Sequence, residues 1–314
     1  ATNESVVKIK YVAQTPEPYL DNLIEAFARG EGPDLFFADQ KMLNRLAGKI
    51  TDIPYSVYPQ RDALNNFADG VSVFMNSKGL RAMPMFIDPL VMYYNRTMYT
   101  SANIVIPPKN WTEFLATIKP ITEMDTRNNI TRTAAALGEF RNVTNAKDIF
   151  STLLFQAGNP IITTDISDNY NSVLADAFGF TPPPAEAAIA FYQQFANPTQ
   201  VSYTWNRSLS DDKDMFTAEK LATYFGLASE LADLQAKNPH LNLDAVVMPQ
   251  KDPQKRVTYG DFYGVVIAKS STKQNSAMAA TALLAQATNQ ANLAKVLGYL
   301  PARRDLLVAK DNDP

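Results

Sequence analysis

Aromatic and polar side chains that suit a sugar gather where the pattern of helices and strands is interrupted. These residues are Trp205 in an irregular stretch, Tyr259, Asp261 and Phe262 just before an apolar run, and Tyr299 followed by Arg303. The C–H face of a sugar stacks on aromatic rings, and its hydroxyls form directional hydrogen bonds with polar side chains. For any one of these residues, a place at the end of the hydrophobic core is the better explanation. The set together favours a sugar-binding site.

Most other chemistry is excluded by what the sequence lacks. With no cysteine there is no disulfide, thiolate zinc site or cysteine nucleophile, and the single histidine, His240, rules out two-histidine metal motifs. Phosphate-binding glycine loops and the G-x-S-x-G elbow are also absent. The stretch from Asp125 to Asn129 begins like a calcium loop, but Ile130 and Ala136 occupy the positions of the required Gly and Glu. We therefore expect no catalytic residues, no metal and no cofactor.

The bulk composition is that of an ordinary globular chain. It has 314 residues, 46% hydrophobic and 19% charged, which is typical of roughly two domains. A net charge of −3 argues against a nucleic-acid partner. The longest apolar runs are far shorter than the roughly 20 residues that span a bilayer, and no signal peptide is evident. The sequence alone leaves two settings open, the cytoplasm or a trimmed, exported form.

Short apolar strands alternate with amphipathic helices along the whole chain. Helix starts are indicated by Asn110 with Glu113 and by Asn145 with Asp148, and a helix end by Gly298. We expect strands at 6–13, 33–38, 82–88, 90–95, 245–248 and 263–268, and helices at 19–29, 39–46, 111–119, 146–157, 184–196, 227–237 and 276–297. This alternation predicts an α/β fold with mainly parallel sheets.

Two adjoining segments carry a resemblance to a known family. Met83–Arg96 reads MPMFIDPLVMYYNR, and Ile106–Phe114 reads IPPKNWTEF. Four shorter stretches follow in the same order at 136–138, 145–149, 221–226 and 298–304. Together they resemble the bacterial extracellular solute-binding proteins of ABC importers, family 1, the maltose-binding-protein-like group that binds sugars. The resemblance covers about residues 6–306.

The resemblance implies a two-lobe, type II periplasmic-binding-protein-like fold with ligand held between the lobes. Lobe I would comprise 1–91 and 264–300, and lobe II 96–260 and 301–314. The hinges near 92–95 and 260–265 would use Tyr93, Tyr94, Asn95, Gly260 and Gly264. Compared with the family, lobe I lacks its first strand and helix. A lipid-modified cysteine, which often tethers such proteins at the N-terminus, is also absent from this sequence.

The implied function is capture of a sugar or oligosaccharide and its delivery to the permease subunits of an ABC importer, by a monomer without catalysis. We expect Trp205 and Tyr259 as stacking platforms and Asp88 as a hydroxyl acceptor, with Tyr224, Phe262, Arg303, Asp261 and Tyr299 as further ligand-binding residues. The location would be periplasmic or extracellular, at the membrane through an N-terminal anchor outside this sequence. The alternatives are a degenerate paralogue that serves as a scaffold and, less favoured, a carbohydrate-active enzyme using Asp88 and Asp261.

Overall fold

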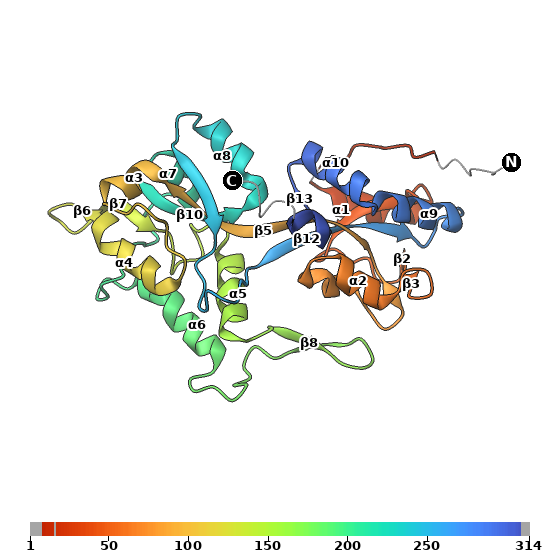
Figure 1. Cartoon of the computed structure of the whole chain (residues 1–314), viewed down its shortest axis with the longest axis horizontal. Coiled ribbons are helices and arrows are strands. Elements are labelled where there is room, and N and C mark those ends of the chain that lie inside the picture. Colours follow the sequence, from red (N-terminus) through yellow and green to blue (C-terminus); the bar gives the residue numbers. More distant parts are fainter. Residues whose placement is uncertain (1–7, 16, 309–314) are drawn as a thin grey trace. The chain divides into compact units, whose positions relative to one another are not determined.

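The computed structural model describes residues 8–15 and 17–308 (Figure 1). They divide into two compact units. Unit 1 consists of the residues up to Asp88 together with those from Asp261 onward, and unit 2 is the continuous stretch Pro89–Gly260. The chain therefore leaves unit 1 at Asp88 and returns to it at Asp261.

Unit 1 surrounds a short sheet with helices. Strand β12 pairs with β1 and with β2, and the unit 1 part of β5 pairs with β13. Its core includes Phe36, Leu46 and Phe74, all buried. The elements are α1 (Tyr19–Arg29), β1 (Leu35–Asp39), β2 (Ile50–Thr51), β3 (Ile53–Pro54), α2 (Gln60–Asn66), η1 (Asp69–Phe74), β4 (Gly79–Leu80), β5 (Met83–Asn95, shared with unit 2), β12 (Gly260–Ala268), α9 (Gln274–Leu284), α10 (Ala287–Leu297), β13 (Leu300–Pro301) and α11 (Arg304–Val308).

Unit 2 packs helices around the second part of β5 and β10. Strand β5 pairs with β10 and β11, and β7 pairs with β10 and β6. The further elements are α3 (Arg96–Ser101), α4 (Trp111–Ile121), β6 (Glu123–Met124), β7 (Ile130–Ala135), α5 (Ala146–Ala157), β8 (Ile162–Thr164), β9 (Tyr170–Ser172), α6 (Pro184–Gln193), η2 (Gln194–Ala196), α7 (Asp212–Thr217), β10 (Leu221–Leu227), η3 (Ala228–Glu230), α8 (Leu231–Lys237) and β11 (Leu243–Val247). None of the helices in the described ranges is long and apolar enough to cross a membrane.

Strand direction differs from the prediction. The pairs β1–β12, β2–β12, β5–β13, β5–β10 and β5–β11 are all antiparallel, and β7–β10 is parallel. The prediction of mainly parallel sheets is therefore wrong for the antiparallel pairs of β5 and β12. The alternation of helices and strands could not reveal it, because β5 and β12 run against the strands they pair with.

Several helix boundaries follow directly from local signals in the sequence. Helix α1 covers the predicted range, and Gly30 ends it with φ +73, a left-handed conformation that costs glycine little. Helix α4 starts where predicted, because the Asn110 side chain accepts a hydrogen bond from the Glu113 backbone N–H at 2.9 Å. Glu113 in turn accepts the Lys109 N–H at 2.7 Å, so the first turn of α4 is well capped.

Other predicted elements are absent or divided. Residues 8–13 form no strand, and residues 6 and 7 lie outside the described residues. The predicted helix at 39–46 is a series of turns, and the strands on either side of Pro89 are one continuous strand, β5. The predicted helix at 276–297 is two helices, since Gln286 is extended with ψ 145.

The predicted lobe boundaries need correction at the C-terminal end. Residues 301–308, assigned to lobe II, belong to unit 1. The Ala302 N–H donates to the Met85 carbonyl at 3.0 Å, and the Arg304 guanidinium donates to the Phe67 carbonyl at 2.9 Å. These bonds fix the segment to unit 1.

Most of the predicted hinge residues have structural roles within one unit. Tyr93 and Tyr94 are paired on both sides by β10 and β11, and the Asn95 side chain caps α3 by accepting the Met98 N–H. Gly264 is packed so closely that an added Cβ would lie 2.8 Å from the Ala82 Cβ. Such packing does not suit a hinge. Gly260 lies at the unit boundary, and its role as a hinge stays a prediction.

Candidate functional site

Three carboxylates of unit 1 come from strand positions close to its boundary. Asp39 is the last residue of β1 and pairs in register with Tyr263 of β12. Asp261 lies two residues before Tyr263 on the same strand, and Asp88 is the last unit 1 residue of β5. Three strands thus bring together acidic groups that are far apart in the sequence.

Asp261 is held by two neighbours that directly follow β1. Its Oδ1 accepts a hydrogen bond from Gln40 Nε2 at 2.9 Å, and its Oδ2 forms an ion pair with Lys41 Nζ at 2.7 Å. The Gln40 side-chain oxygen accepts the Phe262 backbone N–H at 2.8 Å, which ties the loop after β1 to β12. Asp261 is 3% exposed, whereas the Lys41 side chain is 45% exposed. The ion pair therefore reaches from the interior to the surface of unit 1.

A row of aromatic rings adjoins these carboxylates. Phe37 stacks on Phe86 with ring centroids 6.1 Å apart, and Phe86 stacks on Tyr299 at 6.0 Å. Tyr299 then meets Tyr263 at 5.1 Å with an interplanar angle of 49°. Phe86 is buried, while Phe37, Tyr263 and Tyr299 are half-buried. The row therefore has a rigid apolar base and partly accessible rings.

The pKa values of Tyr263 and Tyr299 are raised partly because carboxylates lie close to both hydroxyls. Burial raises the pKa of the Tyr263 hydroxyl, and the negative charges of Asp261, Asp88 and Asp39 raise it further. Burial and Asp88 also raise the pKa of Tyr299. Both hydroxyls are therefore neutral and able to donate hydrogen bonds at neutral pH. Neutral donors, carboxylate acceptors and ring faces are the groups that a sugar ring requires.

The same carboxylates do not converge as metal ligands do. Within residues 8–15 and 17–308, no three Asp, Glu or His side chains are grouped closely enough to hold a metal ion.

In unit 2, Tyr224 belongs to a buried polar network instead of an open surface. Its hydroxyl donates to Glu230 Oε2 at 2.7 Å, and Lys213 forms an ion pair with the same carboxylate. The Asn145 amide donates to Glu230 Oε1 at 2.9 Å and to the Tyr224 hydroxyl at 3.1 Å. Asn145 precedes α5 as predicted, but its side chain makes no cap bond there. Since Tyr224 is fully buried and its hydroxyl is engaged, its predicted role in ligand binding is not supported.

The charges in this network set opposite pKa shifts. Burial alone would favour protonated Glu230, but hydrogen bonds from Lys213 and Tyr224 hold its pKa below the ordinary value. Burial raises the pKa of Asp212, although two hydrogen bonds from Thr144 oppose that shift. The hydrogen bonds and the ion pair of this network hold the end of β10 against α5 and α7.

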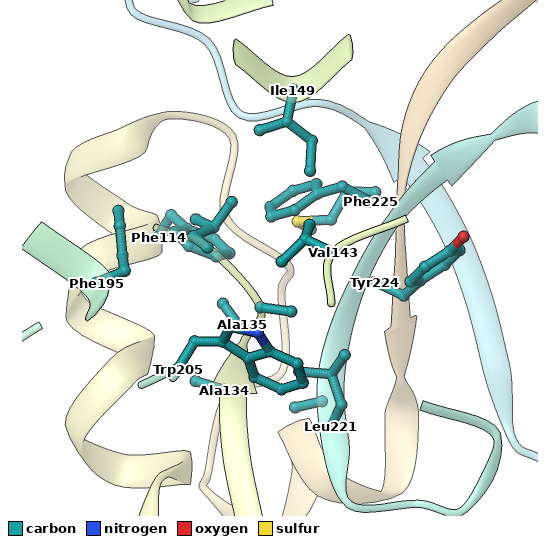
Figure 2. Packing of buried hydrophobic residues seen from close by; sticks show 14 of the residues in the cluster. Phe114, Ala134, Ala135, Val143, Ile149, Phe195, Trp205, Leu221, Tyr224 and Phe225 are labelled. Carbon is teal, nitrogen blue, oxygen red and sulfur yellow. The ribbon is translucent and has the colours of Figure 1, made fainter. Parts of the chain in front are cut away.

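The prediction that Trp205 is a stacking platform is wrong. Its exposed fraction is 0%, and its indole N–H donates to Asn142 Oδ1 at 3.0 Å. Figure 2 shows the ring inside the hydrophobic cluster of unit 2, beside Ala134, Ala135 and Leu221. A ring with no exposed surface cannot stack on a solute.

Two more predicted residues have structural roles in unit 1. Phe262 packs edge-to-face on Phe74 at 6.3 Å in the core, so it is not available to a ligand. Arg303 forms two hydrogen bonds with the Asp305 carboxylate, at 2.9 and 2.8 Å, and a third with the Ala285 carbonyl. These bonds anchor the C-terminal segment and occupy the guanidinium.

Tyr259 of unit 2 is half-buried. Its backbone N–H donates to Thr152 Oγ1 at 3.0 Å, and the Lys147 ammonium lies 5.3 Å from its ring centroid. A cation over the ring is favourable and covers that side. Its role in ligand binding stays a prediction.

Unit 2 also has a shallow hollow that contains none of the predicted residues. Its volume is about 350 Å³, and its lining includes Gly138 and several amide side chains, Gln193, Gln194, Asn197 and Gln200. It has neither the rings nor the charges of the unit 1 cluster.

Asp39, Gln40 and Lys41 are not among the predicted site residues, because the sequence pattern favours a helix at 39–46. Asp39 ends the apolar strand β1, and Gln40 and Lys41 directly follow it. Polar residues at strand ends are a known signal of ligand sites in α/β proteins. Asn145 and Glu230 gave no such signal, since their partners lie 80 or more residues away or in another element.

Comparison with known proteins identifies the family. Residues 1–312 match the family described as bacterial extracellular solute-binding protein. The curated diacetylchitobiose binding protein DasA of Streptomyces coelicolor is 25% identical over 228 residues, which cover 72% of this chain and 50% of that protein. The chain thus belongs to the bacterial extracellular solute-binding proteins, and it spans about half the length of this curated relative.

Solved structures give the same fold. A cyclo/maltodextrin-binding protein complexed with maltotetraose matches with a TM-score of 0.71 at 18% identity, over 93% of this chain and 71% of that one. A solute-binding protein of an ABC transporter from Thermotoga lettingae, bound with α-D-tagatose, matches with a TM-score of 0.65 at 22% identity, over 93% and 72%. The predicted α/β, two-lobe periplasmic-binding-protein fold and the family resemblance are confirmed.

Proposed function

We propose that this chain captures a sugar or oligosaccharide outside the cytoplasmic membrane and delivers it to the permease of an ABC importer. The solute is bound and released without chemical change. Family membership supports the solute-binding role, and the location follows from the extracellular character of that family.

The observation that carries the proposal is the unit 1 cluster of rings and carboxylates. Half-buried Tyr263 and Tyr299 offer ring surface and neutral hydroxyl donors, and half-buried Asp39 and exposed Lys41 offer charged hydrogen-bonding groups beside them. Asp88 and Asp261 are only 1% and 3% exposed, so the predicted direct contacts of these two carboxylates with the sugar are not supported. Hydrogen bonds to charged groups are stronger than neutral ones and suit the hydroxyls of a sugar.

The relatives support a sugar as the class of solute. The curated relative is a diacetylchitobiose binding protein, and the two solved structures are complexes with maltotetraose and α-D-tagatose. Binding is favoured over hydrolysis by the contacts of Asp261, since both of its oxygens are engaged by Gln40 and Lys41. One chain carries all the residues proposed for capture, so a monomer suffices for this step.

Isothermal titration calorimetry against a panel of solutes tests the proposal. The panel contains diacetylchitobiose, maltotetraose and tagatose, with a dipeptide and glycerol as non-sugar controls. We expect saturable binding of at least one sugar with a stoichiometry near one, and chromatography of the recovered solute should show it intact. The absence of heat with every sugar, or cleavage of the bound sugar, would overturn the proposal.

A further inference from the structure

The β8–β9 hairpin of unit 2 is a two-stranded sheet by itself. Strands β8 and β9 pair with each other, and all of their residues are exposed. Figure 1 shows the hairpin as a thin arm projecting from unit 2. A hairpin of only two strands is at best marginally stable in water, and a third strand adds the hydrogen bonds and apolar contacts that stabilise it.

The hairpin has an apolar and a polar face. Its register pairs Thr163 with Asn171, so these two polar side chains share one face. Ile162 and Tyr170 lie on the opposite face with their cross-strand partners Ser172 and Thr164, because side chains alternate along a strand. Ile162 is 51% exposed, and Ile166 in the turn is 100% exposed. A further strand would add along an edge, and within the described residues no other strand pairs with β8 or β9.

A second segment has the sequence of a strand but forms none. Residues 8–13 read Lys-Ile-Lys-Tyr-Val-Ala, and they are exposed and without strand structure. In an extended conformation, alternation would put Ile9 and Tyr11 on one face, and Lys8 and Lys10 on the other together with Val12. Tyr11 is 78% exposed, so this segment also presents apolar surface to water.

The charges of the two segments are complementary. Residues 159–183, which contain the hairpin, carry the three carboxylates Asp165, Asp168 and Asp176 and no Lys or Arg. Residues 8–13 carry two lysines and no acidic residue. If the added strand places Ile9 and Tyr11 on the same face of the sheet as Ile162 and Tyr170, Lys8 and Lys10 lie on the face of Thr163 and Asn171. Both lysines are then near the acidic turn of the hairpin.

We propose that residues 8–13 of one copy add to the β8–β9 hairpin of a second copy as its third strand. Main-chain hydrogen bonds would supply the affinity, and the alternating side chains and charges the specificity. The chain would then self-associate through a surface that contains none of the residues proposed for sugar capture. This inference therefore stands independently of the proposed function.

Cross-linking between two single-cysteine variants tests the contact, since the sequence contains no natural cysteine. Tyr11→Cys is mixed with Ile162→Cys, and separately with Ser172→Cys, the cross-strand partner of Ile162. If the strand adds beside β8, the mixture with Ile162→Cys should give a mixed dimer with a short bismaleimide. If it adds beside β9, the mixture with Ser172→Cys should do so. Val105→Cys, at an 89% exposed position elsewhere on unit 2, is the matched control. Cross-linking no greater than with that control would overturn the proposal.

A charge exchange provides the second test. Thr163→Lys with Asn171→Lys should weaken self-association in sedimentation velocity by about tenfold or more, because like charges would then face each other. Adding Lys8→Glu and Lys10→Glu to that chain should restore self-association, because opposite charges then face each other. A wild-type chain that stays monomeric across the concentration series, or charge variants that sediment like it, would contradict the inference. Sugar titration of each variant should match the wild type.

Discussion

Truncation of Tyr299 tests the unit 1 site at one of its half-buried rings. Tyr299→Ala removes the half-buried ring that stacks on Phe86 at 6.0 Å and meets Tyr263 at 5.1 Å. Loss of an aromatic residue that anchors a ligand costs about 1–3 kcal/mol, which corresponds to a roughly 5- to 150-fold rise in Kd. We expect a rise in this range for the tightest-binding sugar, measured by isothermal titration calorimetry. Tyr299→Phe keeps the ring and should retain most of the affinity.

A matched tyrosine separates binding from packing. Tyr58 is also half-buried in unit 1, and its ring lies 6.1 Å from that of buried Phe67 at an angle of 35°. Tyr58→Ala should lower the melting temperature about as much as Tyr299→Ala, with Kd unchanged. If Tyr299→Ala binds the sugar within about twofold of the wild type, a difference below about 0.5 kcal/mol, Tyr299 is not part of the site. An equal loss of affinity in Tyr58→Ala would show that both variants act through folding.

Two further predictions concern residues that stabilise the units. Glu230→Gln should lower the free energy of unfolding by about 1–3 kcal/mol at pH 7, because the charged hydrogen bonds from Lys213 and Tyr224 are lost. A lowered pKa stabilises the fold above the unfolded value near 4.5, so in urea titrations the wild type should lose this advantage over the variant as the pH falls through the folded-state pKa. An advantage that persists unchanged to pH 3 would contradict this reasoning. Gly264→Ala should cost about 1–3 kcal/mol, since its Cβ would lie 2.9 Å from the Met83 carbonyl oxygen; wild-type stability would show that this packing is looser than described.

Local signals explain which elements could be predicted from the sequence. Helix α1 and the start of α4 depend on an amphipathic pattern, a terminal glycine and an Asn110–Glu113 cap, all within a few residues. The turns at 40–48 bury Leu43 and Leu46 three residues apart, a spacing that also fits a helix. A spacing rule cannot distinguish the two, because tertiary packing decides the backbone.

The candidate site was predictable only in part, for the same reason. Asp88, Asp261 and Tyr299 lie together because antiparallel pairing joins β1 with β12 and β5 with β13, which the sequence pattern did not indicate. Trp205 has an irregular backbone that is typical of a surface loop, yet Asn142, 63 residues away, satisfies its indole and allows full burial. Long-range partners of this kind leave no trace in a single sequence.

A crystal structure of the chain with its tightest-binding sugar tests the central claim most directly. We expect the sugar to contact the rings of Tyr299 and Tyr263, with hydroxyls hydrogen-bonded to Asp39 or Lys41. A sugar bound only elsewhere, for example in the hollow lined by Gln193 and Asn197, would contradict the account.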